Sequence, residues 1–513
     1  MIVIYHQYNK VVEVLFNEES MSFSKKNIPE NLFNIAKKYP DQLIIWCQLD
    51  LKLNLNHEIL PKIFHHNKIM ASFNVSGSSF LPDTIGYVDE SPFLNVKKDV
   101  SYPTWKMSSD VGGIHSSVLK ALYRGIKIDS NFDYFLNSLA KLTIEKGLLC
   151  YSEPSLIKNN LVNIKNRHQS NNLRAFRFVK QHYKTRWTLL LFLNLFLYER
   201  KLVFLPLLSS LFFKRRILKE SVLDQIHIVS SKKIEEEKTI DVIIPTIGRK
   251  AFLYDFLKDL SKQSHLPENV IIIEQNPDLN SESELDYLTL ESWPFRIKHT
   301  FTHQTGACNA RNLALTGVES KWIFMADDDI RINNDFIEKG FNVVDTVICG
   351  QITFGCFQPN YSQSKKLNKI HQWETFGSGC SIVRTKNIKS LFFNKSFEFG
   401  FGEDSDYGMQ LRKLGFDILY SPKPEIIHLK APIGGFRTKP VLLWDKEDVQ
   451  PKPSPTVMLY KILYLIPEQI KGYKTVLFFK FYPVQKIKNP VKYFYNFKKQ
   501  WESSVFWADK LKN

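Results

Sequence analysis

Three consecutive carboxylates, Asp327, Asp328 and Asp329, are the side chains in this sequence best suited to chemistry. They directly follow the apolar run 322–326, a pattern typical of a buried strand. Adjacent like charges cost free energy unless a cation neutralises them. Hard oxygen ligands at a strand end suit Mg²⁺ or Mn²⁺ together with a phosphate-bearing substrate. The alternative is an acidic turn that only caps the strand.

Other polar groups follow predicted strands of the same kind. A short β-branched strand ends in Pro245 and Thr246, Arg249 precedes an amphipathic helix, and the next strand ends in Glu274. Strand, helix and strand in this order predict a βαβ unit of a parallel sheet. Ligands bind outside the carboxyl ends of such strands. We therefore expect these groups to converge with the three aspartates on one crevice.

Three further segments carry candidate side chains. Arg311 lies in a helix after a glycine turn, where its guanidinium presents a fork of donors to a phosphate or a base. Trp373 precedes a Gly/Ser turn that includes Gly379, and its ring either stacks on a sugar or belongs to the core. Glu403 and Asp404 begin an amphipathic helix, either as part of a site or as a simple N-terminal cap.

The order of these motifs resembles that of family 2 glycosyltransferases. It comprises a strand ending in Pro-Thr, an Ala-Arg-Asn helix, Asp-x-Asp, Gly-Ser-Gly, Gly-Glu-Asp and a final His428. The resemblance covers roughly two fifths of the chain. It implies a nucleotide-sugar-binding glycosyltransferase A fold and an inverting sugar transfer that depends on Mn²⁺ or Mg²⁺. Glu274 stands where the family commonly has an aspartate, which puts the longer side chain near the nucleobase.

The resemblance also implies roles for single residues. Asp329, Asp327 and His428 would hold the metal ion, which neutralises charge on the leaving nucleoside diphosphate. Asp404 would accept the proton of the acceptor hydroxyl, and Glu403 would bind the acceptor or orient Asp404. Donor binding is expected from Pro245, Thr246, Arg249, Glu274, Arg311, Asp327 and Asp328, and acceptor binding from Trp373 and Gly379.

The first 158 residues resemble a second copy of this domain in which most of the acidic residues and the histidine are missing. Segment 43–52 resembles 322–331, with Gln48 and Asp50 in the places of Asp327 and Asp329. Two more pairs of segments correspond: 105–119 with 373–383, and 147–154 with 415–422. In this alignment Glu403 and Asp404 fall near Phe135 and Leu136, and His428 falls near Asn160.

We therefore expect the first copy to be a degenerate domain that is structural or binds the acceptor. The alternative is an active first domain, for which Asp50, Asp129 and Asp133 remain as carboxylates. That alternative would make the protein a bifunctional glycan polymerase.

The composition of the chain indicates which kinds of partner and which compartment suit the protein. The chain has 513 residues, which predicts two or more domains, and its net charge of +17 favours anionic partners. Six cysteines without a CxxC pair argue against a zinc site or a disulfide framework and fit a reducing compartment. The N-terminal residues lack the basic and apolar regions of a signal peptide.

Two apolar runs, 187–198 and 202–213, flank a charged triplet and are followed by basic residues. Each is shorter than the ~20 residues that span a bilayer. They predict a helical hairpin that dips into an anionic membrane interface, or a helix pair packed on its own domain. The basic, aromatic C-terminal stretch repeats this pattern. Nucleic acid is the other partner it would suit, but no recognised motif accompanies it.

These observations predict an α/β chain with two tandem nucleotide-diphospho-sugar transferase domains of the glycosyltransferase A type, mostly parallel sheets and helical membrane-proximal segments. The expected divisions are 1–158, 159–238, 239–440 and 441–513. The expected function is transfer of a sugar from a nucleotide sugar to a hydroxyl of a growing cell-surface glycan, such as a polysaccharide, O-antigen or capsule. The expected location is cytoplasmic, on the inner face of the cell membrane. The alternatives are the bifunctional polymerase, a nucleotide-sugar-binding scaffold without turnover, and a nucleotidyltransferase.

Overall fold

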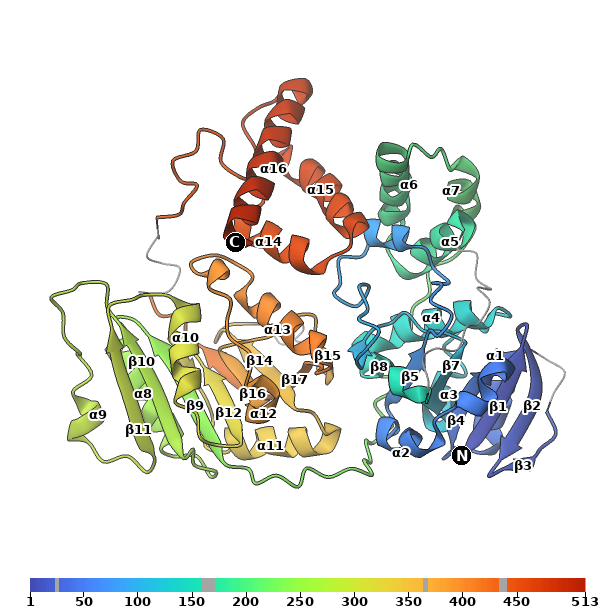
Figure 1. Ribbon diagram of the computed structural model, residues 1–513, viewed down its shortest axis with the longest axis horizontal. Coiled ribbons are helices and arrows are strands. Elements are labelled where there is room, and N and C mark those ends of the chain that lie inside the picture. Colours follow the sequence, from blue (N-terminus) through green and yellow to red (C-terminus); the bar gives the residue numbers. More distant parts are fainter. Residues whose placement is uncertain (24–26, 159–170, 363–367, 433–440, 513) are drawn as a thin grey trace. The chain divides into compact units, whose positions relative to one another are not determined.

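The computed structural model describes residues 1–23, 27–158, 171–362, 368–432 and 441–512. The chain divides into two compact units (Figure 1). The N-terminal unit comprises residues 1–232 together with 465–484, and the C-terminal unit comprises residues 233–464 together with 485–513. The C-terminal extension therefore contributes to both units.

The N-terminal unit is built on one mixed sheet with the strand order β3-β2-β1-β4-β7-β5-β8-β6. The central strand β4 is apolar from Leu43 to Cys47, and Trp46 in it is fully buried. The strands are β1 (Ile2–Gln7), β2 (Lys10–Phe16), β3 (Glu19–Ser20), β4 (Leu43–Gln48), β5 (Ile69–Phe73), β6 (Tyr102–Pro103), β7 (Val111–His115) and β8 (Leu149–Ser152).

Amphipathic helices bury their apolar stripes against this sheet. In α1, for example, Asn27 caps the N-terminus by accepting from the backbone N–H of Glu30, and Leu32 and Ala36 are completely buried. The helices of the unit are α1 (Ile28–Lys38), α2 (Leu60–Ile63), α3 (Ser116–Leu122), α4 (Phe132–Thr143), α5 (Asn172–His182), α6 (Thr185–Glu199), α7 (Phe204–Leu211) and α15 (Pro467–Phe481).

The C-terminal unit has a second mixed sheet with the order β11-β10-β9-β12-β16-β14-β17-β13, and β15 pairs with β17. Its central strands β9, β10 and β12 are buried throughout or nearly so, as expected for parallel strands covered on both faces. The strands are β9 (Ile240–Thr246), β10 (Asn269–Gln275), β11 (Arg296–Thr302), β12 (Trp322–Ala326), β13 (Ile330–Arg331), β14 (Gln351–Phe357), β15 (His371–Gln372), β16 (Cys380–Arg384) and β17 (Leu419–His428).

Helices cover this second sheet and carry parts of the site. Helix α10 packs on β9 and β10, and α11 packs on β17. The helices are α8 (Lys250–Leu260), α9 (Tyr287–Leu290), α10 (Ala307–Thr316), α11 (Phe336–Val347), α12 (Thr385–Ile388), α13 (Glu403–Lys413), α14 (Pro455–Tyr464) and α16 (Pro490–Lys512). Helix α14 is joined to α13 through the hydroxyl of Tyr464, which donates to Asp406 over 2.7 Å.

The prediction of mostly parallel sheets is wrong, because both sheets are mixed. Parallel pairing links β9, β10, β11 and β12, but β16 runs antiparallel to β12 and to β14. In the N-terminal unit β1 and β2 form an antiparallel hairpin. Its two-residue turn, Tyr8–Asn9, has positive φ at both positions, the backbone twist that matches paired strands.

The predicted repeat is confirmed in the strand topology. The order β1-β4-β7-β5-β8-β6 matches β9-β12-β16-β14-β17-β15, and the pairing direction agrees at each step. The register agrees as well, since Leu43 pairs with His115 where Trp322 pairs with Arg384. This register places Gln48 and Asp327 at equivalent positions, as the sequence alignment predicted.

The alignment of the acidic helix is corrected by the structure. Helices α4 and α13 begin at Phe132 and Glu403, so Asp133, not Leu136, is the counterpart of Asp404. Both carboxylates accept from a loop serine N–H, Asp133 from Ser109 at 3.0 Å and Asp404 from Ser378 at 3.2 Å. The alignment failed because a 3₁₀ turn at 144–146 lengthens the connection to the following strand. Asn160, the predicted counterpart of His428, lies outside the described residues.

The two apolar runs form the helices α6 and α7 within the N-terminal unit. Helix α7 packs against α5, and α15 packs against α6, where the Thr475 hydroxyl donates to Asn194 at 2.6 Å. None of the helices in the described ranges is both long and apolar enough to cross a membrane.

Candidate active site

One cavity lies at the carboxyl ends of β9 and β12 in the C-terminal unit. Its volume is about 380 Å³, within the range of roughly 300–1,000 Å³ common for small-molecule sites. The turn into α10 and the first turn of α13 close it. The predicted residues that line it are Pro245, Thr246, Arg249, Arg311, Asp327, Asp328, Asp329, Gly379, Glu403, Asp404 and His428.

Asp328 is buried and organises the floor of the cavity. It accepts from the Thr246 hydroxyl at 2.7 Å and from Arg249 Nη1 at 2.6 Å. Burial raises the pKa of Asp328 to about 6, and the neighbouring guanidinium opposes that shift. Asp328 therefore positions Thr246 and Arg249 at the cavity wall.

Asp327 faces a different arginine. Arg311 Nη2 donates to Asp327 Oδ1 over 3.0 Å, and the guanidinium is almost fully buried. Burial lowers the pKa of Arg311, but the surrounding carboxylates, Asp327 foremost, hold the pKa above its ordinary value. Gly379 is required beside this pair, because a Cβ there would lie 2.2 Å from Asp327 Oδ2.

Asp329 pairs with the predicted histidine. His428 Nε2 lies 3.3 Å from Asp329 Oδ1, and Asp329 Oδ2 accepts from the backbone N–H of Ala431 at 2.9 Å. Hydrogen bonding to Asp329 raises the pKa of His428. Burial raises the pKa of Asp329, but its hydrogen bonds outweigh burial and leave the pKa below the usual value. The end of β17 thus brings His428 to the aspartate end of β12.

The donor atoms for a metal ion are only partly assembled. No group of three His, Cys, Asp or Glu side chains poised around a metal occurs in the described ranges. Asp329 and His428 face one another and offer the carboxylate and imidazole ligands that suit Mn²⁺. Asp327, the third predicted ligand, is instead paired with Arg311.

The acidic pair at the start of α13 lies in the cavity wall. Gly402 precedes it with a φ of 119°, a conformation that favours glycine. Burial, and then the charge of Asp404, raise the pKa of Glu403 to about 7. Burial also raises the pKa of Asp404, while Arg311 acts in the opposite direction. Carboxylates with raised pKa values in a cavity suit proton transfer.

Glu274, predicted to bind the donor, forms hydrogen bonds with other residues of the C-terminal unit. Its Oε2 lies 2.9 Å from His299 Nε2 and accepts from the Ser283 hydroxyl at 2.5 Å, and its Oε1 accepts from the Glu284 N–H at 3.2 Å. The next residue, Gln275, lines the cavity.

Trp373, predicted to bind the acceptor, packs among aromatic neighbours. Its ring centroid lies 4.9 Å from that of Tyr420 and 5.6 Å from that of His371. Its backbone carbonyl accepts from Arg412, and it packs against the apolar core.

Sequence reasoning missed Glu398. Its Oε1 accepts from the N–H of Cys308 at 3.0 Å and its Oε2 from the N–H of Asn309 at 2.8 Å, so it caps α10 from outside the helix. A Cβ at Gly306 would lie 2.4 Å from the Glu398 carboxyl carbon. The available signal was one acid between two aromatic residues, Phe397 and Phe399, which is weak without the fold.

Residues 241–398 match the family described as glycosyl transferase family 2. The chain therefore contains a glycosyltransferase family 2 domain at residues 241–398. The matched segment includes the three aspartates and ends before Glu403, Asp404 and His428. No curated protein matches the chain.

Several solved structures share a distant likeness. TarS from S. aureus is 18% identical, with a TM-score of 0.30 and coverage of 38% of this chain and 37% of that one. GalNAc-T7 with UDP, GalNAc and Mn²⁺ is 11% identical, with a TM-score of 0.37 and coverage of 51% and 55%. Mannosyltransferase PcManGT from Pyrobaculum calidifontis with GDP-Man and Mn²⁺ is 12% identical, with a TM-score of 0.30 and coverage of 47% and 65%. In each of these three matches the chain spans less than two thirds of the solved protein.

Proposed function

We propose that the C-terminal unit transfers a sugar from a nucleotide sugar to a hydroxyl of a glycan acceptor, with inversion at the anomeric carbon. The observation that carries this proposal is the cavity itself, in which Asp404 lies among the three strand-end aspartates, Arg311 and His428. The growing cell-surface glycan expected from the sequence is the acceptor class we retain.

In the proposed reaction the acceptor oxygen attacks the anomeric carbon while the bond from that carbon to the phosphate oxygen breaks. Asp404 takes the hydroxyl proton, and the electron pair of the broken bond leaves with the nucleoside diphosphate. Arg249 and Arg311 line the cavity, where they would hold the diphosphate by charge-assisted hydrogen bonds. Asp329 and His428, with Asp327, would hold Mn²⁺ or Mg²⁺, which when bound supplies Lewis-acid neutralisation of the leaving group.

Replacement of the base tests this assignment. Asp404→Asn keeps the size of the side chain and removes the proton acceptor, so transfer should fall about 10²–10⁴-fold, while binding of the donor is retained. Sugar transfer and donor affinity would be measured on the same samples, with the exposed Asp509→Asn as the matched control. Undiminished transfer by Asp404→Asn would show that another group is the base.

We also propose that the N-terminal unit attaches to an anionic membrane surface through the hairpin α6–α7. Leu205 and Phe212 are 72% and 89% exposed, far more than apolar side chains packed on their own domain. The hairpin presents further exposed apolar side chains, Leu189, Leu202, Phe204, Leu208 and Leu211, beside the exposed cations Arg200, Lys201, Lys214 and Arg215. Apolar groups rimmed by cations fit an interface of anionic headgroups.

Vesicle co-sedimentation tests this surface. The protein should bind vesicles that contain phosphatidylserine more strongly than vesicles of phosphatidylcholine alone. Leu205→Ser with Phe212→Ser should weaken that binding, whereas Leu279→Ser with Leu290→Ser, which removes two equally exposed leucines of the C-terminal unit, should not. Equal losses in the two variants would contradict a specific role for the hairpin.

A further inference from the structure

The N-terminal unit contains two cavities that adjoin at Asp133. The larger, about 480 Å³, and the smaller, about 310 Å³, are both lined by Phe80 and Asp133. The larger cavity also contains His6, Gln48 and Ser109, which the shared register places where Pro245, Asp327 and Ser378 lie in the catalytic cavity. The larger cavity is therefore the counterpart of the donor side.

The donor side of this unit has lost its metal-binding character. Gln48 replaces the first aspartate and is buried, with Nε2 donating to Asp110 Oδ1 over 2.7 Å. Asp50, the counterpart of Asp329, is exposed and accepts from Gln7 Nε2 at 3.3 Å. The larger cavity therefore has no carboxylate at the positions equivalent to Asp327 and Asp329, the two aspartates expected to hold the metal ion in the catalytic site.

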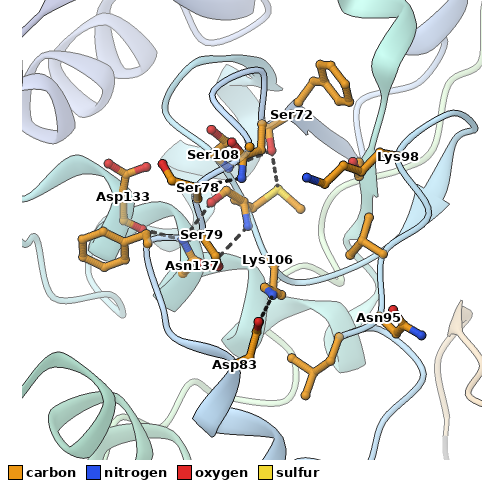
Figure 2. A pocket seen from close by; sticks show the side chains of 18 of the residues that line it. Ser72, Ser78, Ser79, Asp83, Asn95, Lys98, Lys106, Ser108, Asp133 and Asn137 are labelled. Carbon is orange, nitrogen blue, oxygen red and sulfur yellow. Dashed lines mark hydrogen bonds and ion pairs between the residues drawn. The ribbon is translucent and has the colours of Figure 1, made fainter. Parts of the chain in front are cut away.

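The smaller cavity lies on the other side of Asp133 and is polar and partly cationic (Figure 2). Lys98 and Lys106 both line it, and the charge of Lys98 contributes to lowering the pKa of Lys106, after burial. The partner of Lys106 is Asp83 at 3.6 Å, whose side chain is 68% exposed. For Lys98, the described residues provide no carboxylate within salt-bridge distance. Two ammonium groups in one cavity favour an anion between them.

The opposite end of the smaller cavity offers fixed hydrogen-bonding groups. Asp133 accepts from the N–H and the hydroxyl of Ser109, each at 3.0 Å, which holds the carboxylate in place. Asn137 is held by the backbone of Met107, with Nδ2 donating to the carbonyl over 2.8 Å. Ser78 and Ser79 add hydroxyls to the lining, and Phe80 adds an apolar ring. Fixed carboxylate, amide and hydroxyl groups beside one ring suit a ligand rich in hydroxyls.

We propose that this cavity binds a sugar that carries a phosphate or a carboxylate group. Lys98 and Lys106 would contact the anionic group, and the end formed by Asp133 and Asn137 would contact the sugar hydroxyls. The unit would then keep the acceptor side of a glycosyltransferase after losing the donor side. Identifying the bound sugar as part of the acceptor glycan rests on the proposed function, whereas the binding itself does not.

Saturation-transfer NMR of the sugars and ³¹P NMR line broadening of inorganic phosphate, both measured with the full-length chain, test this inference. The probes are glucose 6-phosphate, glucuronic acid, glucose and inorganic phosphate. At least one of the two anionic sugars should bind more tightly than glucose and than inorganic phosphate. Lys98→Met with Lys106→Met should weaken that binding by about tenfold or more, the loss expected for charged hydrogen bonds.

Two further variants make the result specific. Lys37→Met with Lys120→Met removes two exposed lysines of the same unit and should leave binding unchanged. Asp133→Asn should weaken the binding of the anionic sugar without affecting the binding of inorganic phosphate. Unfolding temperatures of all variants would verify that each is folded.

Three results would overturn the inference: no binding of either anionic sugar, equal affinity in the Lys98 and Lys106 variant, or inorganic phosphate binding as tightly as the anionic sugars. The proposed function is tested separately, because Asp404→Asn should lose transfer while still binding the anionic sugar. Binding without transfer by the wild-type chain would contradict the proposed function and leave this inference intact.

Discussion

At the scale of single residues, the three consecutive aspartates have three different environments. Asp327 faces Arg311, Asp328 is buried against Thr246 and Arg249, and Asp329 faces His428. Their order in the sequence indicated a charged strand end, but not this division. It arises because successive side chains at the end of a strand point in different directions and meet different elements.

The pH dependence of transfer follows from the raised carboxyl pKa values. Burial holds the pKa of Asp404 above its usual range, and the pKa of Glu403 is about 7. A base works unprotonated, so activity is present above the raised pKa of Asp404 and is lost as the pH falls through it. The midpoint of the acid limb in a pH profile of kcat/KM should therefore lie at a pH above about 3.9, the ordinary pKa of aspartate.

A second variant checks the cause of that limb. Glu403→Gln should leave the acid limb in place, because burial and the charge of Asp404 raise the pKa of Glu403 to about 7, so that Glu403 is already uncharged while Asp404 titrates. The measurement is a pH profile of kcat/KM for both proteins. A limb at or below the ordinary aspartate value in the wild-type chain would contradict Asp404 as the base.

Gly379 gives a steric prediction. A Cβ at this position would lie 2.2 Å from Asp327 Oδ2, so Gly379→Ala should displace Asp327 from Arg311. Misplacement of a positioned group by about 1 Å costs on the order of 10²-fold in rate, and transfer assays would measure that loss. Gly317→Ala is the matched control, because its nearest neighbour would be 3.6 Å away. Similar activity in the two variants would refute the steric argument.

At the scale of elements, the site depends on how each strand end and helix start is capped. Glu398 caps α10 through two backbone N–H groups. Glu398→Ala should reduce the free energy of unfolding of the C-terminal unit by about 1 kcal/mol, measured by denaturant unfolding. The exposed Glu282→Ala serves as control. Unchanged stability of Glu398→Ala would mean that water replaces the carboxylate without loss.

Local patterns predicted the elements of the catalytic half well. Buried apolar runs identified β9, β10 and β12, and the helix that begins at Glu403 was expected from its acids and its closing glycine. Strand directions were less predictable, because pairing is set by long-range packing that short segments do not encode. Glu398 was missed for the same reason, since the helix it caps is about 90 residues away in the chain.

At the scale of the whole molecule, one topology occurs twice with different chemistry. Asp133 and Asp404 occupy equivalent positions, but only the C-terminal unit has acids on its cavity where Asp327 and Asp329 lie. Sequence alignment found the repeated strands, because their apolar patterns persist. It misplaced Asp133, because a three-residue turn changed the spacing between helix and strand.

The most direct test is hydrolysis of a panel of nucleotide sugars by the purified protein, with Mn²⁺ or with EDTA. Two equivalent strand-end aspartates provide the comparison, Asp329→Asn in the C-terminal unit and Asp50→Asn in the N-terminal unit. The proposed function predicts slow release of one nucleoside diphosphate that EDTA and Asp329→Asn abolish and Asp50→Asn leaves unchanged. Release that persists in EDTA, or that is lost in Asp50→Asn and kept in Asp329→Asn, would contradict catalysis by the C-terminal unit.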